Sequence, residues 1–148
     1  MTFERTLLAG WADMDLNAHM RNSAFLDKCS DVRMLFFAER GFSAAEFHRR
    51  RIGPVVMKDD LEYYREVSLM ESLRVTLECA GLAPDGSRFR LRSDIWRADG
   101  VLAARVASTG GWLDLSTRKL IVPPDEIRDA MMAATKAADF EVLPSSIK

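Results

Sequence analysis

Cysteines are scarce in this sequence, and it lacks both long apolar runs and an excess of one charge. Cys29 and Cys79 lie far apart in apolar surroundings; with no export signal, this predicts two free buried thiols in a reducing compartment, the cytoplasm. The first apolar run, residues 7–10, is too short for a signal peptide or a membrane span. A net charge of −1 leaves no positive field for nucleic-acid phosphates. We therefore expect neither a membrane nor a nucleic acid as partner.

The length and composition fit one domain over residues 1–148. A chain of 148 residues can bury a core without metal or disulfide bonds. Its apolar fraction of 48% and charged fraction of 29% are typical of globular proteins. Because no linker, repeat or low-complexity tract interrupts the chain, we predict a single domain.

Apolar spacing predicts a long helix over residues 23–40. Apolar residues recur there at steps of three and four, with others widening the stripe: Phe25, Leu26, Cys29, Val32, Leu35, Phe36 and Phe37. Such a wide stripe predicts burial on several sides. Asn22 or Ser23 can cap its N-terminus, and Gly41 can end it. A second, short helix is predicted after Ser43, because a glutamate follows at capping-box spacing.

Alternation of apolar and polar residues predicts half-buried strands over much of the remaining chain. The predicted strands are residues 2–10, 55–63, 73–79, 88–96 and 101–115. Gly86 and Gly100 lie in turn sequences that favour antiparallel neighbours. Pro123 and Pro124, followed by two acidic residues, predict a C-terminal helix.

These elements predict an α+β architecture in which a long central helix is wrapped by an antiparallel sheet of about five strands. We expect the last four strands to form a meander, because the turns between them are short. Such a sheet leaves long edge strands exposed, and self-association through the sheet is therefore expected.

The segment whose residues are most suited to catalysis is the polar loop of residues 12–21, which leads into the predicted helix. It contains Asp13, Asp15 and His19, and Asn22 follows directly. Unpaired amides at a helix N-terminus, together with the helix dipole, can polarise a carbonyl oxygen. A nearby carboxylate can then activate water or attack the carbonyl carbon. This arrangement favours hydrolysis by acyl transfer.

The same segment resembles a known motif. Asp13, Asp15, His19 and Asn22 match the pattern D-x-D-x-x-x-H-x-x-N of the 4-hydroxybenzoyl-CoA thioesterase family and its acyl-CoA relatives. The resemblance covers most of the chain and implies a hot-dog fold. It also implies an acyl-CoA thioesterase that needs no cofactor and acts as a homodimer or homotetramer, with acyl-CoA bound at a subunit interface.

Carried over to this sequence, the resemblance makes Asp15 the general base or nucleophile. The helix N-terminal amide near Asn22 becomes the oxyanion donor. His19, Arg21 and Ser23 are predicted to contact substrate. Asp60 and its neighbour Asp59 are further candidates in a strand near the expected pocket, and the sequence does not decide which of the two faces inward. Arg21 stands where an asparagine is common in relatives, and Ala18 stands where a glycine is common. These departures bear on which acyl group the site accepts.

Several features also have simpler interpretations. Asp13 before a helix is more typical of a turn or cap residue than of a catalyst. The histidines and cysteines lack metal-ligand spacing, so no metal is predicted. Two arginine groups can bind CoA phosphates, although a solvated face is the more common role: Arg49, Arg50 and Arg51, and Arg88, Arg90 and Arg92.

Two other functions stay open on sequence grounds. One is a non-catalytic module that binds acyl-CoA or an acyl carrier. The other is a hydratase or dehydratase of the same fold, which would depend on a histidine and acid pair such as His19 with Asp15.

Overall fold

The central helix, α1 (Asn22–Ala38), packs its apolar stripe against one face of the sheet in a computed structural model that describes residues 1–147. Its buried residues are Ala24, Phe25, Cys29, Val32, Phe36 and Phe37. Leu35, on the opposite side, is 39% exposed. Within a single chain, only the sheet-facing side of α1 is covered. The prediction that α1 is buried on several sides is therefore wrong at this level.

The N-terminus of α1 is fixed by a backbone hydrogen bond, whereas that of α2 is fixed by a side-chain cap. Arg21 is the N-cap residue of α1, and neither Asn22 nor Ser23 takes that place. The Arg21 N–H donates to the carbonyl oxygen of Asp13 at 2.8 Å, which holds Arg21 extended and lets the helix begin directly after it. The Ser43 side chain accepts from an N–H of α2 (Ala44–Arg50), as its capping-box spacing predicts.

The strands form one sheet in the order β1-β3-β4-β5-β2, with β6 beside β5 and β7 beside β3. All pairs are antiparallel except β3 with β7, which is parallel. The strands are β1 (Phe3–Leu8), β2 (Ile52–Tyr63), β3 (Ser72–Leu82), β4 (Arg88–Trp96), β5 (Leu102–Asp114), β6 (Lys119–Ile121) and β7 (Lys136–Val142). The α+β class and the wrapped helix are confirmed.

Two details of the predicted sheet are wrong. β2 pairs with β5 at the opposite edge from β1, so the chain crosses the sheet between β2 and β3 and does not form a four-stranded meander. An edge strand is covered less than a central one, and most of β2 is exposed, including Met57 at 46%, where a half-buried strand was predicted. β6 and β7 were not predicted, and β7 follows the last helix.

β1 and β7 share one edge of β3. β1 pairs along the first half of β3, from Leu8 opposite Ser72 to Phe3 opposite Leu77. β7 continues along the second half, beginning where Lys136 pairs with Cys79. The two strands therefore lie one after the other beside a single strand.

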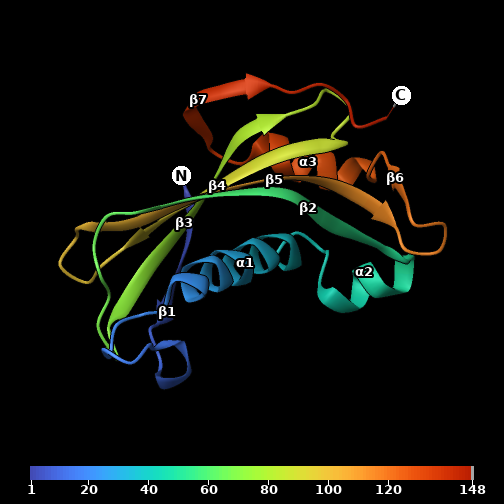
Figure 1. Cartoon of the computed structure of the whole chain (residues 1–148). Helices are drawn as coiled ribbons and strands as arrows, with labels where there is room; N and C mark the ends of the chain where they lie inside the picture. Colours follow the sequence, from blue (N-terminus) through green and yellow to red (C-terminus); the bar gives the residue numbers. More distant parts are fainter. Residues whose placement is uncertain (148) are drawn as a thin grey trace.

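Helices cover both faces of the sheet. Figure 1 shows α1 and α2 on one side and α3 (Asp125–Ala133) on the other. Trp112 of β5 is fully buried between the sheet and the first two helices, in contact with Phe37, Phe47 and Phe89. On the other face, α3 buries Ile127 and Met131, as its spacing predicts. Among the helices of residues 1–147, none is long and apolar enough to span a membrane.

Candidate active site

The loop before α1 is held in place by Asp13. Oδ2 of Asp13 accepts a hydrogen bond from the N–H of Gly10 at 2.9 Å and lies 2.7 Å from Nζ of Lys28 on α1. Partial burial raises the pKa of Asp13, but the hydrogen bonds from Lys28 and Gly10 outweigh that effect and leave the pKa below its usual value. Asp13 therefore joins the loop to the helix, in agreement with its interpretation as a turn residue.

Asp15 organises the tip of the same loop with only one of its carboxylate oxygens. Oδ1 accepts hydrogen bonds from the backbone N–H of Asn17 at 2.8 Å and of His19 at 3.2 Å. The loop closes through the N–H of Asp15 to the carbonyl oxygen of His19 at 2.8 Å, with Ala18 left-handed at φ +59°. Oδ2 makes no hydrogen bond or ion pair within the described chain. The carboxylate is thus oriented, and one oxygen stays available.

The N-terminus of α1 lies beside this carboxylate and is not capped by a side chain. An uncapped helix leaves its first N–H groups available and carries a partial positive charge there. The hydroxyl of Tyr63, at the end of β2, donates to the carbonyl oxygen of Asn22 at 3.1 Å. The Tyr63 ring also packs edge-on against Phe25, with centroids 5.3 Å apart. These contacts fix the start of α1 against the edge strand.

One open cleft of about 360 Å³ brings Asp15, His19 and Asn22 together. Its other lining residues are Met20, Phe25, Tyr63, Tyr64, Arg65 and Glu66. The residues from β2 onward were missed by sequence reasoning, although two adjacent tyrosines at the exposed end of a strand were an available signal. A carboxylate and an open helix end on one cleft wall suit attack on a polarised carbonyl.

His19 faces an acidic residue from the segment that connects β2 to β3. Its Nδ1 lies 3.4 Å from an Oε of Glu66, while its backbone pairs with Ser68. Within the described residues, both hydrogen bonds between His19 and Asp15 use the backbone of His19: its N–H donates to Oδ1 of Asp15, and its carbonyl oxygen accepts from the N–H of Asp15. The His19 side chain is therefore oriented by Glu66 and not by the carboxylate of Asp15.

Three predicted substrate contacts lie outside this cleft. Nε of Arg21 donates to Oγ of Ser23 at 3.0 Å, so these two residues bind each other beside the helix start. Asp60 lines a different cleft, together with Arg92 and Arg105. Alternation along β2 explains the separation, because neighbouring residues of a strand point to opposite faces. Asp59 accordingly accepts a hydrogen bond from the hydroxyl of Ser108 at 2.5 Å. Burial lowers the pKa of Arg33 on α1, and the negative charge of Asp59 opposes this larger effect.

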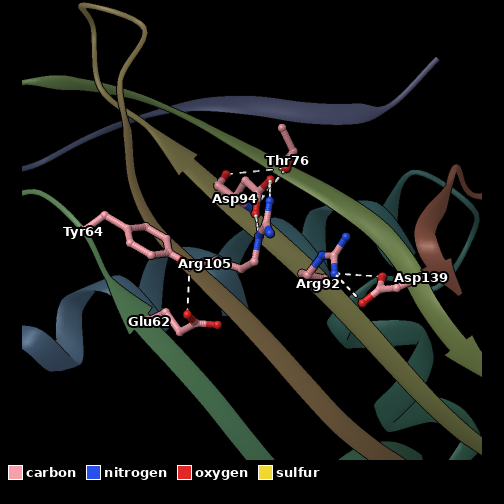
Figure 2. Close-up of polar contacts among 7 residues, drawn as sticks. All are labelled: Glu62, Tyr64, Thr76, Arg92, Asp94, Arg105 and Asp139. Carbon is pink, nitrogen blue, oxygen red and sulfur yellow. Dashed lines mark hydrogen bonds and ion pairs between the residues drawn. The ribbon is translucent and has the colours of Figure 1, made fainter.

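The sheet face opposite α1 carries a network of charged pairs (Figure 2). Arg105 donates to both carboxylate oxygens of Asp94, at 2.7 and 3.0 Å. Arg92 binds Asp139 of β7 at 2.9 Å. Hydrogen bonding to the Asp94 carboxylate raises the pKa of Arg105. On this outer face, two arginines are therefore each paired with a carboxylate, whereas Glu62 accepts a hydrogen bond from the hydroxyl of Tyr64 at 3.1 Å.

Four of the six arginines named for CoA phosphates have acidic partners within the described chain, whereas Arg51 and Arg88 donate to the hydroxyls of Ser116 and Ser146. Arg49 and Arg50 both bind Glu46, and Arg90 binds Glu141 at 2.8 Å. Arg92 is paired on the outer face, so a role in phosphate binding would require these ion pairs to open. For these four arginines, the pairs favour the simpler interpretation as charged surface.

Neither thiol is positioned as a nucleophile. Cys29 and Cys79 are free and buried, which confirms the prediction. Burial raises the pKa of the Cys29 thiol to about 12, and it raises that of Cys79 as well. Within the part of the chain that the structure describes, no group of three or more metal-ligating side chains occurs.

The chain matches one protein family and is similar in structure to several solved proteins. The model of the thioesterase-like superfamily matches residues 9–131. No curated protein matches the sequence significantly. A hypothetical protein of Staphylococcus aureus in complex with CoA superimposes at TM-score 0.81 and 23% identity, covering 89% of this chain and 82% of its own. A 1,4-dihydroxy-2-naphthoyl-CoA thioesterase from Synechocystis does so at 0.80 and 18%, covering 90% and 97%. At these identities, the structural likeness establishes a shared fold.

Proposed function

We propose that this chain, a thioester hydrolase that belongs to the thioesterase-like superfamily and has its hot-dog fold, hydrolyses an acyl-CoA thioester at the cleft of Asp15. One observation carries the proposal: a carboxylate with a free oxygen and an uncapped helix N-terminus line the same cleft. CoA as the leaving group is supported by two proteins of this fold, one in complex with CoA and one named for a CoA thioester.

The proposed reaction uses only groups of the chain and water. The thioester carbonyl oxygen accepts hydrogen bonds from the N–H groups at the start of α1, near Asn22, which stabilise the oxyanion. Oδ2 of Asp15 then takes one of two roles. As a general base it accepts a proton from water, whose oxygen bonds to the carbonyl carbon as the C–S bond breaks and the thiolate leaves. As a nucleophile it bonds to that carbon and expels the thiolate, and water then hydrolyses the anhydride.

We further propose that a homodimer or homotetramer completes the site. The cleft is open in one chain, and apolar side chains beside it face solvent, with Trp11 81% and Leu16 103% exposed. β2 is a twelve-residue strand that pairs on one side only, so its free edge can pair with a second copy. A partner there would cover the cleft and displace bulk water from it, which strengthens the hydrogen bonds to the oxyanion.

The interface proposal is tested by charging the free edge of β2. Val56→Lys changes an apolar residue that is 37% exposed and is not part of the cleft. We expect the variant to run as a smaller species in light scattering and to lose turnover in parallel. An unchanged assembly with full activity places the interface elsewhere.

The catalytic proposal is tested by turnover of a panel of acyl-CoAs with the wild type and Asp15→Asn. Asp129→Asn, on the exposed side of α3, is the matched control. We expect only Asp15→Asn to lose turnover while CoA binding persists. Full turnover by Asp15→Asn on a good substrate shows that the assignment of Asp15 is wrong.

A single turnover in H₂¹⁸O tests for an anhydride that water opens at its aspartyl carbonyl, because only this route puts ¹⁸O in Asp15. Attack at the acyl carbonyl of the anhydride would label the product as a general base does. A general base delivers the water oxygen to the acid product, which carries ¹⁸O from the first turnover. If water attacks the aspartyl carbonyl of the anhydride, the first product is unlabelled and ¹⁸O stays in the carboxylate of Asp15. Mass spectrometry of product and protein reads both outcomes.

The two other functions predict different results in the same panel. Tight binding of acyl-CoA by calorimetry without product identifies a binding module. Hydration of an enoyl-CoA identifies a hydratase, although the pairing of His19 with Glu66 does not provide the histidine and Asp15 pair that this chemistry needs.

We also propose a cytoplasmic location, which the two free buried thiols support.

A further inference from the structure

A second cleft, on the opposite side of the sheet from α1, is almost entirely apolar. It has a volume of about 260 Å³ and lies between the end of β3, α3 and β7, the upper layer in Figure 1. Its lining residues are Cys79, Leu82, Ala83, Pro84, Met131, Met132, Lys136, Phe140 and Val142. An apolar cavity of about 150 Å³ can bind benzene, so this cleft is large enough for a ring or a chain of roughly six to ten carbons.

Lys136 is the one charged residue of that lining within the described chain. Its Nζ donates to the carbonyl oxygen of Met132 at 3.1 Å, and an ammonium group has three N–H donors. No carboxylate lies within ion-pair distance of Lys136 among residues 1–147. Nearby Arg90 and Arg92, by contrast, both have acidic partners. Nζ also lies 5.4 Å from the centroid of the Phe140 ring. Lys136 is therefore an exposed cation beside an apolar cleft, with a carbonyl oxygen and a ring as neighbours and no carboxylate partner among residues 1–147.

The rest of the cleft offers no second charge. Burial raises the pKa of the Cys79 thiol, which keeps that thiol neutral at physiological pH. The other lining side chains are aliphatic, thioether or aromatic. A ligand that fits this lining has one anionic group at Lys136 and an apolar body.

We propose that this cleft binds a monocarboxylate with an apolar body of roughly six to ten carbons, its carboxylate held by Nζ of Lys136. Transfer of the apolar body from water is favourable, and the ion pair fixes its orientation. The site is independent of the proposed function, because no residue of the Asp15 cleft takes part in it.

Methionine methyl NMR on the intact protein, titrated with octanoate, shows where the ligand binds. Met131 and Met132 line this cleft, whereas Met20 lines the cleft of Asp15. We expect the first two methyl signals to shift and that of Met20 to stay. Octanoate that shifts only Met20, or no signal, overturns the proposal. Asp15→Asn should bind octanoate like the wild type, so failure of the catalytic proposal leaves this result distinct.

Three variants test the contacts by calorimetry with octanoate. Lys136→Gln should weaken binding about three- to tenfold, because an ion pair at an exposed lysine is screened by solvent and contributes less than a buried one. Lys119→Gln, on exposed β6, is the matched control and should bind normally. Val142→Trp, at a position 69% exposed on the cleft wall, should block binding without disturbing the core. Octanoate that binds equally to Lys136→Gln or to Val142→Trp contradicts the proposed site.

Discussion

The two faces of the sheet carry polar residues in opposite ways. On the outer face, the carboxylate of Asp94 is almost fully buried and both of its oxygens bind Arg105. At the start of α1, Asp15 is exposed, and one of its oxygens holds the loop while the other has no partner within residues 1–147. On the outer face, Arg92 and Arg105 are thus each paired with a carboxylate.

On the proposal for Asp15, the density of charge does not locate the functional site. A paired carboxylate has its lone pairs occupied and contributes to stability. A carboxylate that is oriented but only half occupied, beside an uncapped helix end, can still act on a ligand. Variants of the two regions should therefore separate activity from stability.

The largest effect is expected on turnover, from Asp15→Asn compared with Asp94→Asn. Loss of a general base or nucleophile should lower kcat on the order of 10²–10⁴-fold for Asp15→Asn, with little change in Tm. Asp94→Asn should keep its kcat and lose stability. Steady-state kinetics and thermal melts on the same preparations check both. Equal kinetic losses in the two variants would erase the distinction between the two faces.

The next effect is on stability and depends on which partner of the outer pair is removed. Arg105→Met leaves the Asp94 carboxylate, with 9% of its side chain exposed, without a counter-ion. We expect a loss of about 2 kcal/mol, less than for a fully buried pair, because the Arg105 side chain is 37% exposed. Asp94→Asn should cost less, since Arg105 can turn to solvent. Urea unfolding measures the order, and the reverse order contradicts this account of burial.

Asp13→Asn sharpens the contrast within the loop itself. It leaves Lys28 without its carboxylate partner and should cost about 1–2 kcal/mol at pH 7. The folded-state pKa of Asp13 is lowered, so the stabilisation is complete above the unfolded pKa of about 3.9 and disappears as pH falls through the folded value. The difference in unfolding free energy should be constant from about pH 5 to 8 and shrink below about pH 4. A difference that grows in acid would contradict the pairing.

The smallest effect is expected from Tyr63→Phe. The variant removes the hydrogen bond from the hydroxyl to the carbonyl oxygen of Asn22 but keeps the ring packing on Phe25. Because the side chain is partly exposed, water replaces the bond, and we expect a loss of about 0.5–1 kcal/mol and a decrease of about two- to fivefold in kcat/KM. Kinetics and melts check it. A loss as large as that of Asp15→Asn would make Tyr63 part of the chemistry.

Elements with strong local signals were predictable from the sequence. The 3.6-residue stripe identified α1, the two turn glycines Gly86 and Gly100 adopt the positive φ expected of them, and the proline-led start of α3 is correct. The loop motif placed Asp15 and Asn22 on one cleft, where their catalytic roles stay predictions. Each of these features depends on residues close together in the chain.

The errors concern features set by distant parts of the chain. Nothing local distinguishes an edge strand from a central one, so the exposure of β2 and its place beside β5 were not predictable from alternation alone. β7 pairs with a strand far away in the sequence and its own pattern is weak. The sequence does not show which face of β2 carries Asp60, because a register difference of one residue reverses the face.

The shared edge of β3 has a consequence for synthesis on the ribosome. β7 leaves the ribosome after every other strand described here, so half of that edge has no backbone partner until residues 136–142 emerge. An unpaired edge in a nascent sheet is prone to association with other chains. The interval before β7 docks is thus the period in which chaperones would most protect this domain.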